Sequence, residues 1–320
     1  MRLGVHVPIA GGLPLALDRA QTLRCTTMQI FSRSPRGGPA PKLSQEDADA
    51  FHKRRVDLGI APLAVHAPYI LNLATPDKKT WGFSHALYLD EYKRVTRLRA
   101  QFLVTHVGSP RGADESVGIA QVAEAINRVL DEVPSETMIL LENTAGSGQG
   151  LGSKFEQLTA IRDGVRDRAR VGICLDTAHL FASGYPIHTP EGLERTIQAF
   201  DREVGLPLVK FIHLNDSKVP FNAKVDRHWH IGYGHIGREA FARILNHPAL
   251  SQLNFVLETP KESDLEDQRN LAMVRSLATR PDIAAEAPPP FPEFALDACA
   301  PPPNATPISA KPKARRRVAS

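Results

Sequence analysis

Apolar runs of five to seven residues recur along residues 1–278, separated by longer stretches with an amphipathic pattern. The runs are LGVHV (3–7), TTMQIF (26–31), LAVHA (63–67), FLVTHV (102–107), MILLENT (138–144), VGICLDT (171–177), VKFIHLN (209–215) and NFVLET (254–259). Between two of them, residues 115–133 carry apolar side chains at positions 119, 122, 123, 126, 129 and 130, which form one face of a helix. The pattern predicts eight strands, each followed by a helical connection.

Eight strand–helix repeats within residues 3–259 match the number and the length of a (β/α)8 TIM barrel. The competing architecture is an open, doubly wound α/β sheet. Such a sheet has no reason to stop at eight strands, and the glycine-rich dinucleotide turn expected after its first strand is absent. We therefore expect an α/β protein with a (β/α)8 barrel.

The C-terminal segment has a different composition. From Pro281 onward it holds ten of the 26 prolines, and it ends in KPKARRRVAS. Such a segment has too little apolar surface to offset its ordering entropy. We predict a barrel domain over residues 1–278 and a disordered tail over 279–320 that is rich in Pro and Ala and ends in basic residues.

The remaining composition indicates a soluble cytoplasmic protein. The chain is 42% hydrophobic and 23% charged, with no secretory segment and no apolar run near the roughly 18 residues of a membrane span. Three widely spaced cysteines, Cys25, Cys174 and Cys299, argue against a disulfide framework and for a reducing compartment. A net charge of +4 is a mild indication of an anionic partner.

Side chains able to bind metal stand at the ends of seven of the eight runs, and the run 26–31 ends instead in Phe31–Ser32. These side chains are His6, His66, His106, Glu142, Asp176, His213 and Glu258. In a barrel the carboxyl ends of the strands meet at one face, where the loops build the active site. Carboxylates crowded there repel one another, and bound cations would neutralise them.

Loop residues extend this set. His179 follows Asp176 by one helical turn, and Asp226 and His228 are two residues apart, so they point the same way in extended backbone. The nine best ligand candidates are His66, His106, Glu142, Asp176, His179, His213, Asp226, His228 and Glu258. Five imidazoles and four carboxylates suit Zn, Fe or Mn, and they exceed the needs of one tetrahedral ion. We expect a two- or three-metal cluster.

Five motifs resemble, in the same order over residues 2–277, the endonuclease IV family of apurinic/apyrimidinic (AP) endonucleases. They are HAPYILNLA (66–74), LENTAG (141–146), GICLDTAHLFASGY (172–185), HLNDSK (213–218) and VDRHWHIGYGHIG (225–237). The resemblance implies a TIM barrel with three zinc ions. It puts the first on His66, His106 and Glu142. It puts the second on Glu142 (bridging), Asp176, His213 and Glu258, and the third on His179, Asp226 and His228. His6, which aligns with a histidine of the family's first strand motif, is expected to support these ligands and not to bind an ion itself.

The resemblance also implies a zinc-dependent deoxyribonuclease that cuts duplex DNA on the 5′ side of abasic sites, leaving a 3′-hydroxyl and a 5′-deoxyribose phosphate. A zinc-activated hydroxide would be the nucleophile, with Glu142 as the catalytic carboxylate that orients it. Arg36, Tyr69 and Ile70 correspond to the family's DNA-contacting residues, although the loop SRSPRGGPAP (32–41) departs from the usual pattern. The partner is double-stranded DNA with abasic sites, bound by a monomer.

Two other functions fit a barrel with polar strand ends. A metal-dependent sugar isomerase or epimerase uses mostly carboxylate ligands, and five imidazoles together with the Asp226–His228 pair argue against it. A noncatalytic module that binds damaged DNA would have lost ligands, and none of the nine positions is lost.

Overall fold

The computed structural model describes residues 1–261 and 263–279; the predicted tail lies outside them, apart from Thr279. The barrel strands are β1 (Arg2–Val5), β2 (Met28–Ile30), β3 (Leu63–His66), β4 (Phe102–His106), β5 (Met138–Glu142), β6 (Val171–Asp176), β7 (Val209–His213) and β10 (Asn254–Leu257). The helices are α1 (Leu13–Thr22), α2 (Gln45–Asp57), α3 (Lys78–Arg97), α4 (Glu115–Glu132), α5 (Phe155–Asp163), α6 (Thr177–Ser183), α7 (Pro190–Glu203), α8 (Arg238–Asn246) and α9 (Asp264–Leu277). Two short 3₁₀ turns, η1 (Arg168–Arg170) and η2 (Leu206–Leu208), precede β6 and β7.

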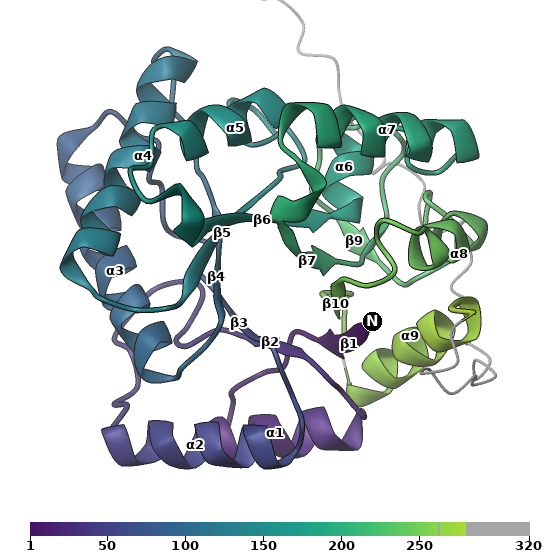
Figure 1. Ribbon diagram of the computed structural model, residues 1–320, viewed down its shortest axis with the longest axis horizontal. Coiled ribbons are helices and arrows are strands. Elements are labelled where there is room, and N and C mark those ends of the chain that lie inside the picture. Colours follow the sequence, from purple (N-terminus) through teal and green to yellow (C-terminus); the bar gives the residue numbers. More distant parts are fainter. Residues whose placement is uncertain (262, 280–320) are drawn as a thin grey trace, which may run out of the picture.

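The eight barrel strands form one parallel sheet in the order β1-β10-β7-β6-β5-β4-β3-β2. The ring closes between β1 and β2, where His6 bridges Gln29 and the Val7 amide donates to the Gln29 carbonyl at 2.7 Å. A Cβ on Gly4 would lie 1.9 Å from the carbonyl oxygen of Thr27, so only glycine permits this close approach. Figure 1 shows the ring of strands with the helices outside it. The predicted TIM barrel is confirmed.

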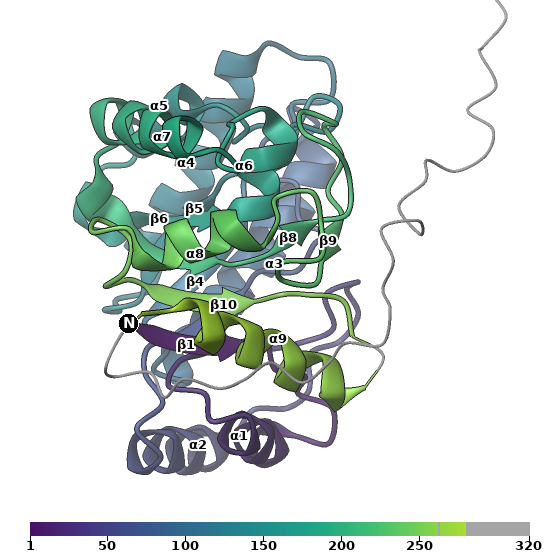
Figure 2. The same cartoon turned by 90° about the vertical axis from the view of Figure 1, so that its right-hand side faces the viewer.

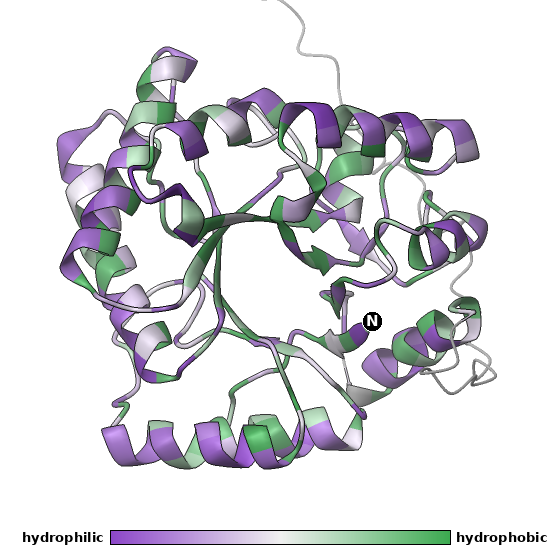
Figure 3. Ribbon diagram, viewed as in Figure 1, coloured by the Kyte–Doolittle hydropathy of each residue, from purple (hydrophilic) through white to green (hydrophobic). Residues whose placement is uncertain are grey.

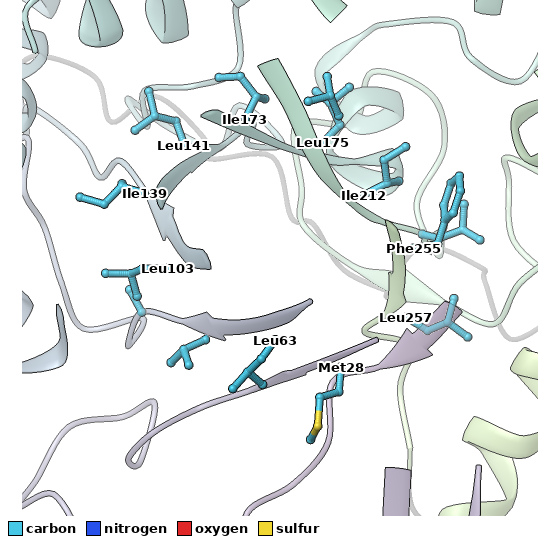
Figure 4. Packing of buried hydrophobic residues seen from close by; sticks show 14 of the residues in the cluster. Met28, Leu63, Leu103, Ile139, Leu141, Ile173, Leu175, Ile212, Phe255 and Leu257 are labelled. Atoms are coloured by element: carbon cyan, nitrogen blue, oxygen red, sulfur yellow. The ribbon is translucent and has the colours of Figure 1, made fainter. Parts of the chain in front are cut away.

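The core has two layers because successive strand residues point to opposite faces. Residues such as Leu63, Leu103, Ile139, Ile173 and Phe255 point outward and pack beneath the helices (Figure 4). A separate apolar cluster formed by Ala64, Val104, Leu140, Cys174, Phe211 and Val256 fills the barrel interior. Both faces of the sheet are therefore buried, which explains the nearly continuous apolar runs in the sequence.

The helices bury one face each against the strands, and their hydrophilic residues lie on the outer side (Figure 3). In α4 the predicted positions Val122, Ala123, Ile126 and Val129 are buried. Side chains also fix helix starts: Asp77 accepts from the Thr80 amide at 2.8 Å at the start of α3. Among the described residues, no helix combines the length and the hydropathy that crossing a bilayer requires.

A two-stranded antiparallel hairpin, β8 (Asp216–Ser217) and β9 (His228–Trp229), interrupts the connection between β7 and α8. Figure 2 shows this hairpin at the end of the barrel away from the N-terminus, where the strands finish. It brings part of the histidine-rich stretch 224–237 to the face where the polar strand ends collect.

Candidate metal centre

Strand alternation carries six of the predicted ligands to one end of the barrel interior. Each lies two residues after a member of the interior apolar cluster: His66 follows Ala64, for example, and Glu142 follows Leu140. A spacing of two returns the side chain to the same face of a strand. The apolar cluster thus lies directly below a polar site. Because the six strands are parallel and share the same two-residue spacing, side chains far apart in the sequence reach the same end of the barrel interior.

Glu142 is the centre of the first ligand group. Its Oε2 lies 3.1 Å from His66 Nε2 and 3.0 Å from His106 Nε2. His66 and Glu142 are buried, whereas His106 is about one-third exposed. The three facing atoms lie within 4.8 Å of one another, so these residues could hold one ion that remains open to solvent on the side of His106.

The second group joins Glu142 to three further strand ends. His213 Nδ1 lies 3.0 Å from Glu142 Oε1, 3.2 Å from Glu258 Oε2 and 3.9 Å from Asp176 Oδ2. The two oxygens of Glu142 thus face different groups, which is the arrangement that a bridging carboxylate needs. Glu142, Asp176, His213 and Glu258 together supply a compact four-ligand set.

The third group lies at the start of α6 and on the β8–β9 hairpin. The tightest set there is Asp176, His179 and His228, with His228 Nε2 3.4 Å from Asp176 Oδ2. The predicted ligand Asp226 adjoins this set, with its carboxylate 3.2 Å from His179 Nε2 and 3.4 Å from His228 Nε2. Asp176 therefore links the second and third groups, in the way that Glu142 links the first and second.

Neighbouring carbonyls orient three of the imidazoles. The Nδ1–H groups of His66, His179 and His228 can donate to the carbonyls of Ala67 at 2.7 Å, Asn143 at 2.8 Å and Glu258 at 3.1 Å. This leaves each Nε2 directed into the site. The buried Nε2 atoms of His179 and His228 make no well-aligned hydrogen bond, although carboxylate oxygens lie 3.2–3.4 Å from them. Buried polar atoms normally find partners, so this donor set fits bound cations.

Electrostatics support the same conclusion. Burial disfavours charge on Glu142, but His106 and His213 outweigh it and hold the pKa of Glu142 well below its ordinary value. Burial opposes the charge of His179 too, yet Asp176, Asp226 and Glu142 raise the pKa of His179 to about 10. Without metal, the His179 imidazole thus carries a proton that offsets the charge of the carboxylates around it, and a cation would take over that role.

Two asparagines form hydrogen bonds to the candidate ligands. Asn215 Nδ2 donates to Asp176 Oδ2 at 2.7 Å, and Asn215 Oδ1 accepts from the Glu258 amide at 2.8 Å. Asn143 Oδ1 accepts from the Asp176 amide at 2.6 Å. Asp176 Oδ1 also accepts from the His179 amide at 2.8 Å and so begins α6. These contacts hold Asp176 rigidly between two ligand groups.

Asp216, a residue that sequence reasoning missed, organises the loop after the hairpin. Its Oδ1 accepts from the amides of Ser217 at 2.7 Å and Ile236 at 2.9 Å. Its Oδ2 accepts from the amides of Gly232 at 3.0 Å and Gly234 at 2.9 Å. A Cβ on Gly234 would lie 2.4 Å from the Ser217 carbonyl, so the glycine allows this wrapping. The sequence around Asp216, HLNDSKV, gives no sign of these backbone partners.

Gln29 is the second missed residue. It belongs to β2 and is fully buried beside the second ligand group. Its Oε1 lies 2.9 Å from His213 Nε2, and its Nε2 donates to Glu258 Oε1 at 2.6 Å. The run 26–31 was expected to end at Phe31–Ser32; β2 ends at Ile30, and Gln29 faces inward one position below Phe31. A polar residue inside an apolar run was the available signal.

The other histidines near the cluster lie outside the three groups. His6 Nδ1 is 3.0 Å from Glu258 Oε1, a contact in line with the expected supporting role. His230 Nδ1 is 3.0 Å from Asn270 Nδ2, behind the hairpin. His235 is exposed, and its amide donates to the Ser217 carbonyl.

Two open cavities flank the cluster. One, of about 410 Å³, is lined by His106, His179 and Asp226 together with loop residues such as Arg111 and Ser147. The other, of about 630 Å³, is lined by His6, Phe31, Glu258 and Lys261 among others. Tyr69 borders both. An elongated polymer could thus lie across the metal centre.

The predicted DNA-contacting residues stand at this rim. Tyr69 and Ile70 are 59% and 47% exposed, and both line the cavity beside His106 and His179. Arg36 is exposed on the neighbouring loop. That loop packs on the rim, because the Tyr69 amide donates to the Pro35 carbonyl at 3.1 Å and a Cβ on Gly37 would lie 3.3 Å from Ile70 Cδ1. Tyr69 and Ile70 therefore lie beside the cluster, and the loop that carries Arg36 packs against them.

Comparisons with known proteins agree with this geometry. A family model described as a xylose isomerase-like TIM barrel matches residues 17–281. A protein of Chloroflexus aurantiacus named "Probable endonuclease 4" is 44% identical over 278 residues, which cover 86% of this chain and 98% of the relative. The crystal structure of endonuclease IV from Thermus thermophilus superposes with a TM-score of 0.78 at 34% identity, covering 87% of this chain and 98% of that one.

A D-tagatose 3-epimerase-like protein superposes with a TM-score of 0.64, covering 87% of this chain and 97% of the other. Its identity of 18% shows a shared fold only. The likeness to endonuclease IV extends to the sequence over nearly the full length of the relatives. The chain therefore belongs to the endonuclease IV family and is an endonuclease of that family.

Proposed function

We propose that the protein hydrolyses the phosphodiester on the 5′ side of abasic sites in duplex DNA, leaving a 3′-hydroxyl and a 5′-deoxyribose phosphate. The observation that carries this proposal is the chain of three ligand groups linked through Glu142 and Asp176, open to solvent between two cavities. Linked sites of this kind suit phosphodiesters, because ions on either side of one phosphate can stabilise both the attacking and the leaving oxygen.

We assign three zinc ions to this centre. His66, His106 and Glu142 would hold the first, and Glu142, Asp176, His213 and Glu258 the second; His179, Asp226 and His228 would hold the third. Mixed imidazole and carboxylate ligands are those that zinc prefers. Bound zinc would lower the pKa of a water molecule towards neutrality and stabilise negative charge on the phosphate.

Within this proposal Glu142 is the catalytic residue of the chain itself. It is fully buried, and the histidines around it hold its pKa low, so it stays ionised at neutral pH. An ionised carboxylate can accept a hydrogen bond from the attacking water and orient it. Asp176 and Asn215 would keep the neighbouring ligands in place during the reaction, because both are buried and hydrogen-bonded.

Arg36, Tyr69 and Ile70 would contact the DNA. An exposed tyrosine ring offers a surface on which a base or sugar can stack, and the exposed Ile70 can fill the space of an unstacked residue. A sugar without its base costs less to rotate out of the helix than an intact nucleotide. That difference would favour abasic sites over normal DNA.

The remaining proposals concern the oligomeric state and the cellular location. We propose a monomer acting on DNA in the cytoplasm. In the part of the chain that the structure describes, Cys25 and Cys174 are buried and unpaired, which is common in cytosolic proteins.

The test uses a duplex with one tetrahydrofuran abasic analogue, labelled at the 5′ end of the damaged strand. The analogue cannot undergo β-elimination, so a cut at its 5′ side must be hydrolytic. We expect a product whose 3′ end a DNA polymerase extends, and no cut in the undamaged duplex. Conversion of a ketohexose without any DNA cleavage would support the sugar epimerase instead and overturn the proposal.

A further inference from the structure

Gln29 lies beside two ligands of the second group and contacts both. These ligands, His213 and Glu258, come from the adjacent strands β7 and β10, and Gln29 reaches them across the barrel interior from β2. The Nδ1 of His213 faces Glu142, Asp176 and Glu258, so its Nε2 is the atom left for a partner outside the cluster.

The amide of Gln29 contacts three side-chain atoms. Its Oε1 lies 2.9 Å from His213 Nε2, and its Nε2 lies 2.6 Å from Glu258 Oε1 and 2.9 Å from His6 Nδ1. One carbonyl and two N–H groups are the full complement of a primary amide, apart from the second lone pair of its oxygen.

Only one orientation of this amide is chemically sensible. With Oε1 towards His213, the imidazole donates Nε2–H to it, and the NH2 group donates to the Glu258 carboxylate. The flipped amide would set its oxygen against a carboxylate oxygen, two acceptors at hydrogen-bonding distance. The network therefore specifies the proton on His213 Nε2 and leaves the Nδ1 lone pair for the cluster.

We propose that Gln29 is a positioning residue for the second ion: it fixes the tautomer and ring angle of His213 and directs Glu258 Oε2 into the site. The role rests on the proposed function, since it presumes an ion at Glu142, Asp176, His213 and Glu258. Outer hydrogen-bond partners of metal ligands typically change metal affinity about 10- to 100-fold when they are removed.

The first variant is Gln29→Met, which keeps the volume and removes the amide's hydrogen bonds to His213 and Glu258. Gln29→Leu repeats the test with a different apolar shape in case the methionine packs poorly. The matched control is Thr27→Val, just before the same strand: Thr27 is also fully buried and loses one hydrogen bond, to the Pro62 carbonyl at 2.7 Å, but it touches no ligand.

The measurement is zinc release into excess chromogenic chelator from the full chain, counted per chain. We expect one ion to leave the Gln29 variants about 10- to 100-fold faster than from the native protein, or to be absent already after gel filtration. The other ions should leave at native rates, and Thr27→Val should match the native protein. General loosening of the barrel would not select one ion.

The outcomes separate the two proposals. If the native protein holds zinc and both Gln29 variants release every ion at native rates, the role of Gln29 is wrong and the proposed function is untouched. The same holds if Thr27→Val releases an ion as fast as Gln29→Met. If the native protein binds no zinc, both proposals fall.

Discussion

Replacing Asp216 with asparagine should destabilise the loop that carries the third ligand group. The side chain of Asp216 is fully buried, and four backbone amides donate to it, two to each oxygen. Asparagine keeps the shape, but its NH2 group replaces one acceptor, so two amides lose their partner. Each buried amide left without an acceptor costs about 1–3 kcal/mol, which gives about 2–6 kcal/mol in total.

The loss should also reach the metal centre. Asp216 pairs with Trp229 in the β8–β9 hairpin, and His228 is the neighbouring residue on β9. We expect Asp216→Asn to lower the free energy of unfolding by this amount in urea titrations and to speed the release of one zinc ion. The control is Asp77→Asn, an exposed helix cap at which asparagine serves as well as aspartate. If Asp216→Asn unfolds within about 1 kcal/mol of the native protein and keeps every ion, the assigned role of the four hydrogen bonds is refuted.

Three further predictions test barrel closure, protonation and DNA contact. Gly4→Ala should lower the free energy of unfolding by about 1–3 kcal/mol or more, because the added Cβ would overlap the Thr27 carbonyl; thermal melts measure the loss. Gly82→Ala, in the open part of α3, is the control and should not destabilise the protein. Zinc binding at pH 7 should release at least one proton per chain, seen by calorimetry in buffers of different ionisation enthalpy. The raised pKa of His179, about 10, keeps that imidazole protonated in the metal-free protein, so zinc affinity should rise with pH. Zinc uptake without proton release would contradict this prediction. Tyr69→Ala should weaken binding to an abasic duplex by about 1–3 kcal/mol with zinc content unchanged. Phe83→Ala, an exposed position on α3, is the control and should bind like the native protein. If Tyr69→Ala binds the duplex as tightly as the native protein, Tyr69 does not contact the DNA.

Six of the candidate ligands could be predicted from the sequence, because the alternation of side chains along each parallel strand determines which of them face the barrel interior. Once eight strands were recognised, their inward-facing last residues had to meet at one face. This is why His66, His106, Glu142, Asp176, His213 and Glu258, spread widely along the sequence, come within contact of one another. The spacing of Asp226 and His228 likewise indicated a common direction.

Two kinds of residue escaped sequence reasoning. Gln29 was missed because it stands two residues before Phe31, one inward-facing position below the strand ends at which ligands were expected. Asp216 was missed because its partners are backbone amides of a glycine-rich loop, which no side-chain pattern reveals. The contact between Asp176 and His228 was also not predictable, because it depends on the pairing of β8 with β9, which places His228 next to Asp176.

The most direct test of the central claim, that the cluster around Glu142 is a phosphodiesterase centre, compares the native protein with Glu142→Gln on the tetrahydrofuran duplex. Binding and strand cleavage are measured in parallel, with Glu136→Gln, an exposed residue just before β5, as the control. We predict cleavage on the 5′ side by the native and control proteins, and at least about 100-fold slower cleavage by Glu142→Gln with the duplex still bound. A native protein that binds the duplex but never cuts it, even after zinc is restored, would contradict the account and leave a module that only binds damaged DNA.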